Sequence, residues 1–333
     1  MKIKVFNNKE DILLLKEDWE ALFDKGNYSV FQSFTYCYNS IFKQSKPFII
    51  CYYEDGKLVE IWPLELKKNK LIFINDTHAD FCDIISETDS LTVVDFLKEN
   101  KLASLLRLKN LEKESIAIKK TDSIKVKDVS FSLNYSLLKL GKSDNFPSNF
   151  NHFVYRQKRR LKRILKKYNY NTVLYEIESS NFPIEKIKKL RIQMIELEIR
   201  NHKFLDDDLI SLTENLYKSG SLVVNEVEVE NNTTAISLIF KKDYSYSFWI
   251  DLFNDQQMMN LVSNTAFIKE ITKENSATFN FGRGDYSYKI QNFGPEVIPL
   301  FELNTYCTEA EKYLSLFLKS VKLVLKKLYK KFR

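Results

Sequence analysis

The stretch Phe279–Gly294, FNFGRGDYSYKIQNFG, departs from the composition of the chain around it. The chain has only 7 glycines in 333 residues, and three of them (Gly282, Gly284 and Gly294) lie here. Glycine at the end of a β-rich run permits unusual backbone angles or a close approach of another backbone. Because ligands bind at strand ends that face a crevice in open α/β sheets, this stretch predicts a functional corner.

The length and composition predict a folded chain with more than one domain. A chain of 333 residues exceeds the size at which a single core keeps growing. The polar segment 141–150, GKSDNFPSNF, is the best linker candidate. We therefore expect domains at 1–145 and 146–333.

Hydrophobic periodicity predicts a mixed α/β fold in both halves. In the first half we expect a helix over 8–24, a helix capped by Ser33 and a hairpin turning at Asp55-Gly56. In the second half the expected order is a basic helix over about 150–168, a strand and two helices, then three strands, a helix over about 259–273 and the glycine-rich corner. A strand and a long helix from about 308 complete the chain. The halves resemble one plan repeated with divergent sequence.

Positive charge is concentrated in two segments of an otherwise acidic chain. Residues 151–167 hold eight Lys/Arg and no acid, and residues 319–333 hold seven and no acid. Arginines suit phosphate groups, and we select Arg156 and Arg160, one turn apart, for acceptor contact. The alternative for this basic helix is that its arginines only form a solvated face and bind no substrate. The second segment fits either a last helix packed on its domain, which we favour, or a helix on an anionic membrane.

Other function classes lack their signatures. The four cysteines show no metal-ligand spacing, and Walker and Rossmann motifs are absent. No apolar run approaches the ~20 residues of a membrane span. We expect a cytoplasmic protein, peripheral at most to a membrane, with no metal and with no nucleic-acid partner except under one alternative given below.

Five motifs in order resemble the GNAT superfamily of acyl-CoA N-acyltransferases, in its CelD-type branch of polysaccharide biosynthesis. They are VFQSFTYCYNSIF, IWPLEL, HADFCDIIS, the arginine-rich helix and TFNFGRGDYSYKIQNF. The resemblance implies two tandem GNAT-like folds, acyl-CoA bound to the second copy and an acceptor between the copies. The chain departs from the pattern at residues 254–267. In the family this loop carries glycine and holds the pyrophosphate of coenzyme A, whereas here it has no glycine. Asn264 is the residue best able to replace it.

The resemblance and the residue chemistry together assign candidate roles. Main-chain N–H groups from Asn260 to Thr265, with Asn264 in the place of the glycine and with the hydroxyls of Ser263 and Thr265, would bind acetyl-CoA or another acyl-CoA. Asp285 is the candidate base, with a helix N-cap as its alternative role. Tyr288, or Tyr286 instead, would stabilise the departing thiolate. Lys289, which we count among the catalytic candidates, or Arg283 would hold a substrate phosphate or sugar carboxylate. Asp80 and Asp83 would bind the acceptor amine, and His202 would reach the same substrate cleft.

The resulting function is transfer of an acyl group, first of all acetyl, from acyl-CoA to an amino sugar on a small-molecule or lipid carrier. One alternative is aminoacyl transfer from charged tRNA to a peptidoglycan-type acceptor, with the basic segments facing the RNA. The other is a non-catalytic scaffold of a polysaccharide assembly, which the loop without glycine favours.

Overall fold

The computed structural model describes residues 2–142, 159, 162–163, 166–167, 169–177, 180–254, 259–273, 275–284 and 286–331. Within it the chain forms two compact units, of which the first is discontinuous in sequence. Unit 1 comprises residues 1–132 and 299–333, and unit 2 comprises residues 133–298. This division differs from the expected boundary at 145, because the chain returns to unit 1 for its last strand and helix.

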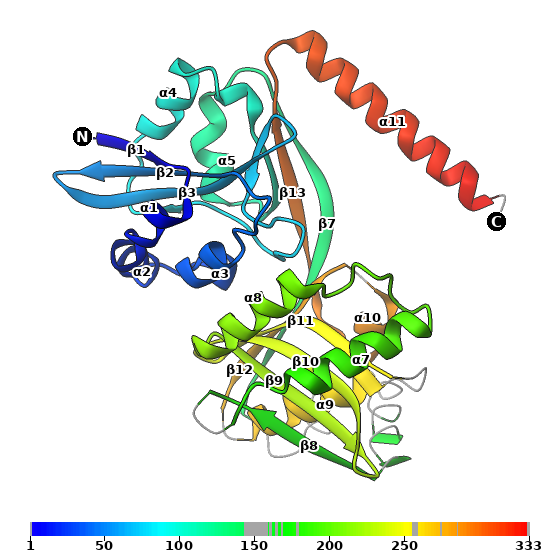
Figure 1. Cartoon of the computed structure of the whole chain (residues 1–333). Coiled ribbons are helices and arrows are strands. Elements are labelled where there is room, and N and C mark those ends of the chain that lie inside the picture. Colours follow the sequence, from blue (N-terminus) through cyan, green and yellow to red (C-terminus); the bar gives the residue numbers. More distant parts are fainter. Residues whose placement is uncertain are drawn as a thin grey trace. The chain divides into compact units, whose positions relative to one another are not determined.

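Unit 1 is built on an antiparallel sheet in the order β1-β2-β3-β4, with β5 also paired to β3. It also contains β6 and β13, which pair with each other in the second, eight-stranded sheet. Its elements run in chain order (Figure 1): β1 (Lys2–Phe6), α1 (Lys9–Leu13), α2 (Lys16–Phe23), α3 (Phe34–Asn39), β2 (Pro47–Glu54), β3 (Lys57–Lys67), β4 (Lys70–Phe73), β5 (Ile85–Ser86), α4 (Thr92–Glu99), β6 (Arg107–Leu111) and α5 (Ile116–Lys120). Strand β13 (Glu296–Thr305) and helix α11 (Glu309–Lys331) complete it.

Local sequence signals explain several of these elements. The Ser33 hydroxyl accepts from the N–H of Tyr36 and begins α3, as predicted. Asp55 and Gly56 both have positive φ, 49° and 83°, so the predicted hairpin turn between β2 and β3 is confirmed. The helix expected over 8–24 is instead two helices, α1 and α2, because the chain turns at Leu14, whose side chain is exposed.

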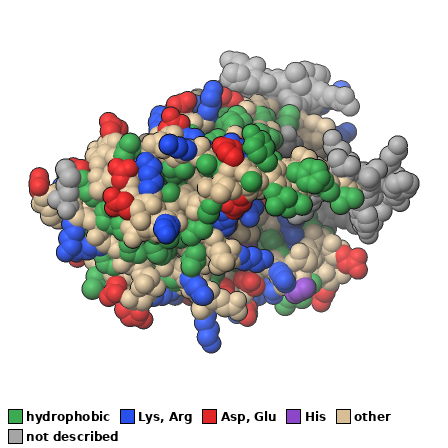
Figure 2. Space-filling view, turned by 90° about the horizontal axis from the view of Figure 1, so that it is seen from above, with side chains coloured by type: hydrophobic (Ala, Val, Ile, Leu, Met, Phe, Trp, Pro, Cys, Tyr) green, Lys and Arg blue, Asp and Glu red, His purple; other side chains and the backbone are tan. Residues whose placement is uncertain are grey.

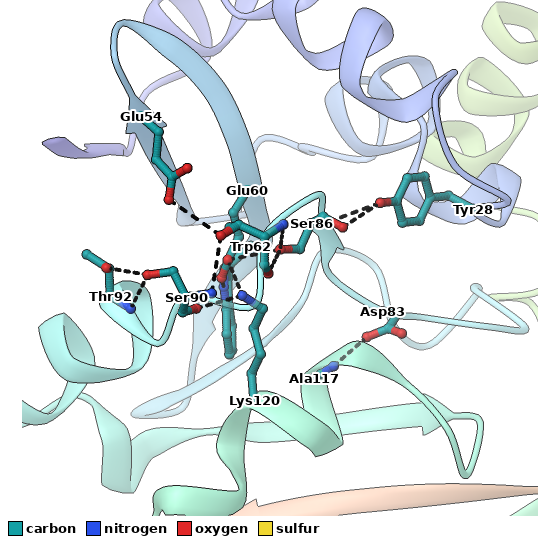
Figure 3. A network of polar contacts seen from close by, with 11 residues as sticks. Tyr28, Glu54, Glu60, Trp62, Asp83, Ser86, Ser90, Thr92, Ala117 and Lys120 are labelled. Carbon is teal, nitrogen blue, oxygen red and sulfur yellow. Dashed lines mark hydrogen bonds and ion pairs between the residues drawn. The ribbon is translucent and has the colours of Figure 1, made fainter. Parts of the chain in front are cut away.

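A buried polar network joins β3 to α5 inside unit 1 (Figure 3). Lys120 Nζ lies 2.5 Å from Glu60 Oε2 and 2.7 Å from the Ser90 carbonyl, and the Trp62 indole N–H donates to Glu60. Burial raises the pKa of Glu60, while its bonds to Lys120 and Trp62 lower it. A buried carboxylate that is fully hydrogen-bonded to an ammonium fixes the helix on the sheet.

Unit 2 contains the strands β7-β12-β11-β10-β9-β8 of a mixed sheet, in that order. Among these described strands, β11 and β12 form the one parallel pair, and the other pairs are antiparallel. Its elements are β7 (Lys127–Leu140, which begins in unit 1), β8 (Tyr170–Tyr175), α7 (Ile184–Glu196), α8 (Asp207–Lys218), β9 (Leu222–Val229), β10 (Asn232–Lys242), β11 (Ser245–Phe253), α9 (Met259–Thr272), β12 (Ala277–Arg283) and α10 (Ser287–Phe293). Most of the predicted basic helix lies outside the described residues.

Helices cover both faces of the unit 2 sheet. On β9 the adjacent residues Asn225 and Glu226 point to opposite faces, as strand geometry requires. Asn225 donates to Ser263 of α9, whereas Glu226 accepts from Lys186 of α7. Phenylalanines of β11, β12, α9 and α10 form the core on the α9 side. The helices packed on both faces of the sheet hold the end of β11 and the start of α9 in place.

Candidate functional site

The candidate site begins where two parallel strands of unit 2 separate. Strands β11 and β12 pair over three residues only, from Ser245↔Thr278 to Ser247↔Asn280. Beyond that point both strands continue, β11 to Phe253 and β12 to Arg283, without pairing to each other. The carboxyl ends of the two strands therefore open a notch in the sheet, where main-chain groups of β11 have no ladder partner on β12.

A β-bulge explains why β11 turns away. Opposite Leu238 and Ile239 of β10 lie Ile250 and Phe248, so Trp249 is the extra residue. A bulge bends its strand and increases the local twist. On the other side of the notch β12 has its own irregularity between Asn280 and Arg283, where Gly282 has a φ of 69°. Glycine is needed here because that φ is strained for other residues.

Asp251 stands on β11 just beyond the bulge, and sequence reasoning missed it. Its Oδ1 accepts from Ser237 Oγ at 2.8 Å, and it is also hydrogen-bonded to Asn264 of α9. Burial raises the pKa of Asp251, although these bonds and the positive charges of Lys289 and Arg200 lower it. The available signal was a lone acid near the end of the apolar strand SFWIDLF. A carboxylate with a raised pKa is a better proton acceptor.

The polar residues of α9 lie inside unit 2 and not in a loop, which corrects the expected pyrophosphate loop. Ser263, Asn264 and Thr265 are buried within α9. Asn225 donates to Ser263 at 2.9 Å, Ser237 lies 3.1 Å from the amide oxygen of Asn264, and the Thr265 hydroxyl donates to the Leu261 carbonyl of its own helix. These side chains are therefore occupied by the protein itself. Only main-chain N–H groups of the first turn, near Asn260, remain suited to an anion.

Lys289 has a different role from the one predicted. Its side chain is buried, and its ammonium donates to the carbonyl of Phe281 and, at 3.1 Å, to that of Arg283. The carbonyls of Gly282 and Gly284 lie 3.4 Å away, and the ring of Tyr286 lies 5.1 Å below the ammonium. An ammonium that is enclosed by carbonyls holds the Gly-Arg-Gly turn in place. Lys289 is thus a positioning residue, and it does not offer its charge to a substrate.

The remaining predicted residues are dispersed. Arg283 is half-buried at the end of β12, and His202 is exposed in the link between α7 and α8. Asp285, Arg156 and Arg160 lie outside the described residues, as does the side chain of Tyr288, whose backbone is in α10. The notch therefore brings together Asn264 and Lys289 with the unpredicted Asp251.

Two predicted acceptor ligands, Asp80 and Asp83, lie in unit 1. Asp83 accepts hydrogen bonds from the backbone N–H groups of Ile116 and Ala117, at the start of α5 (Figure 3), and from Ile84. Burial raises the pKa of Asp83 to about 6, although these bonds lower it. Its carboxylate caps a helix, which corrects its expected role as an amine ligand. Asp80 is buried.

Sequence comparison and structure comparison give different results. No known family matches the sequence, and no curated protein is similar to it. Three solved structures cover most of the chain with TM-scores of 0.60 or more, at 10–11% identity. The first is the C-terminal domain of a putative lysylphosphatidylglycerol synthetase from Agrobacterium fabrum, with a TM-score of 0.62 and 11% identity over 94% of this chain and 97% of that one.

The other two are FemX, with a TM-score of 0.62 and 10% identity over 94% of this chain and 99% of that one, and L-PGS from Bacillus licheniformis, with a TM-score of 0.60 and 11% identity over 88% and 92%. Likeness at this level of identity shows the fold. The expected mixed α/β fold class is confirmed, and the chain shares its fold with FemX and L-PGS. The GNAT superfamily and its CelD-type branch remain predictions.

Proposed function

We propose that this chain is an acyltransferase that joins an activated acyl group to an amine at the notch between β11 and β12. The observation that carries the proposal is the parallel pair that separates beside a bulge, with the first turn of α9 following the same strand. The part of β11 beyond Ser247, which does not pair with β12, would offer N–H and C=O groups to an extended donor, in the way that a strand edge binds a peptide. The amide-bearing arm of coenzyme A fits this mode, so acetyl-CoA or another acyl-CoA is the first donor to test.

The chemistry assigned to the notch is direct attack of the amine on the acyl carbon. The new N–C bond forms as the C–S bond of the thioester breaks, and the amine proton passes to a carboxylate. Asp251 is the described candidate for that acceptor, and main-chain N–H groups by the bulge would stabilise the oxyanion. Asp285 as base and Tyr288 or Tyr286 as partner of the thiolate also remain proposals. The acceptor we propose is an amino sugar, either free or lipid-linked.

A second donor, aminoacyl-tRNA, is favoured by a separate observation. A protein with the same fold is named for the synthesis of lysylphosphatidylglycerol, in which an amino acid is the acyl group. The side chains of α9 also leave few donors for a pyrophosphate, because Ser263 and Asn264 bond to the sheet. In this case the basic segments would contact RNA, and binding would weaken steeply as salt rises.

Calorimetry with the full chain distinguishes the two donors. For an acyl-CoA enzyme we expect saturable binding of acetyl-CoA with a Kd between about 1 μM and 1 mM, the usual range for substrates. Retention of tRNA at low salt only, without binding of acetyl-CoA, would assign the second donor. Absence of both, in protein with a cooperative thermal transition, would remove the acyltransferase proposal and favour the scaffold.

A further inference from the structure

Helix α11 turns an apolar row toward solvent. Apart from Tyr313, five of the large hydrophobic side chains described in this helix are exposed, with Phe317 at 63% and Leu325 at 60%. Spaced three or four residues apart, they follow one side of the helix. The row, which we call the α11 apolar face, consists of Leu314, Phe317, Leu318, Val321 and Leu325.

The side of α11 that approaches the rest of unit 1 is a different one. Lys312, Leu316 and Lys319 are half-buried, and Lys319 Nζ lies 3.9 Å from Asp128 Oδ2 of β7. Figure 2 looks down on the molecule from the top of Figure 1, where α11 lies, and shows apolar side chains exposed on this surface. The expectation of a last helix packed on its domain therefore concerns this contact side, and the α11 apolar face takes no part in it.

Charge decides which occupant fits the α11 apolar face. Residues 319–333 contain seven Lys/Arg and no acid. A second copy of the helix would bring the same charge into contact, which opposes self-association. The occupant must take up apolar side chains and also be anionic. The interface of an anionic bilayer satisfies both requirements, and amphipathic helices with lysine-rich polar sides bind there.

We propose that α11 binds the surface of anionic lipid membranes, with its apolar face inserted among the headgroups. A helix of 23 residues is about 35 Å long and can lie along the surface. No helix among the described residues is long and apolar enough to cross a membrane. The interaction does not depend on the proposed transferase activity, and it would keep the chain beside lipid-linked molecules.

Vesicle flotation of the full chain tests this inference. We expect binding to vesicles of equal parts phosphatidylcholine and phosphatidylglycerol, weak binding to phosphatidylcholine alone, and loss of binding at high salt. The double variant Leu318→Glu/Leu325→Glu should lower the partition coefficient at least about tenfold, because two leucines no longer enter the interface. The matched control is Leu14→Glu, which changes an 80% exposed leucine elsewhere in unit 1 and should bind as the parent does.

Three results would overturn the proposal. One is absence of binding by a wild-type chain with a normal thermal transition, and another is equal binding to both kinds of vesicle. The third is a dimer in analytical ultracentrifugation that the double variant dissociates, since the face would then belong to a second copy. Because both substituted leucines are exposed, the variant should keep the circular dichroism and Tm of the parent.

Discussion

At the scale of single residues, Asp251 is the sharpest test of the proposed chemistry. Asp251→Asn keeps the size of the side chain but removes the proton acceptor, so we expect kcat to fall by about 10²–10⁴-fold with little change in Tm. Because burial raises the pKa of Asp251, the wild-type rate should fall with decreasing pH at a midpoint above that of an ordinary carboxyl group. The measurement is turnover of acyl donor and amine against pH.

The control for this variant is Asp243→Asn, at the exposed turn between β10 and β11. Asp243 has a φ of 52°, which asparagine also tolerates, so neither rate nor Tm should change. Asp251→Asn could instead turn over as fast as the parent, with the same fall of the rate at low pH. The proton acceptor would then be a different group, and Asp285 would become the leading candidate.

The buried ion pair of unit 1 gives a second residue-scale prediction. Lys120→Met leaves the Glu60 carboxylate buried without its ammonium, and we expect the free energy of unfolding to fall by about 3–5 kcal/mol. Lys119→Met is the matched control, because Lys119 pairs with Glu114 at 3.3 Å on the surface, where such a pair contributes about 0–1 kcal/mol. Urea unfolding of both variants measures the difference, and equal losses would contradict it.

At the scale of elements, the β2–β3 hairpin isolates the effect of backbone conformation. Gly56 has a φ of 83° and nothing within 4 Å of an added Cβ, so Gly56→Ala changes strain without creating a clash. We expect a loss of roughly 1–2 kcal/mol in the free energy of unfolding. Gly141→Ala also meets open space, but at an ordinary φ, and should be neutral or slightly stabilising. Thermal unfolding that ranks the two variants the other way would refute the argument.

Helices and strands set by local signals could be predicted from the sequence, whereas those set by distant contacts could not. The hairpin and the start of α3 were predictable because Asp55-Gly56 and Ser33 act on their immediate neighbours. The burial of Ser263 and Asn264 was not, because their partners Asn225 and Ser237 lie on strands 38 and 27 residues away in the sequence. The pairing of β6 with β13 joins Leu108 to Leu303, and nothing local in either strand encodes it.

At the scale of the whole molecule, the discontinuous unit 1 predicts which fragments fold. A fragment of residues 133–298 retains the β7 segment that pairs with β12, from Leu140↔Ala277 to Tyr135↔Arg283. A fragment of residues 146–333 lacks that segment and carries β13 without β6. We expect a cooperative thermal transition from the first fragment and none from the second, as followed by circular dichroism. Cooperative unfolding of the 146–333 fragment alone would support the boundary expected from the linker.

The return of the chain to unit 1 also orders events during synthesis. Strand β6 leaves the ribosome long before β13, the partner that covers its edge, and the whole of unit 2 is made in between. At about 5–20 residues per second this delay lasts on the order of ten seconds or more. An uncovered strand edge is a template for pairing with other chains. Nascent polypeptides that stop before residue 299 should therefore aggregate through their amino-terminal portion, and a holding chaperone would be of most use in that interval.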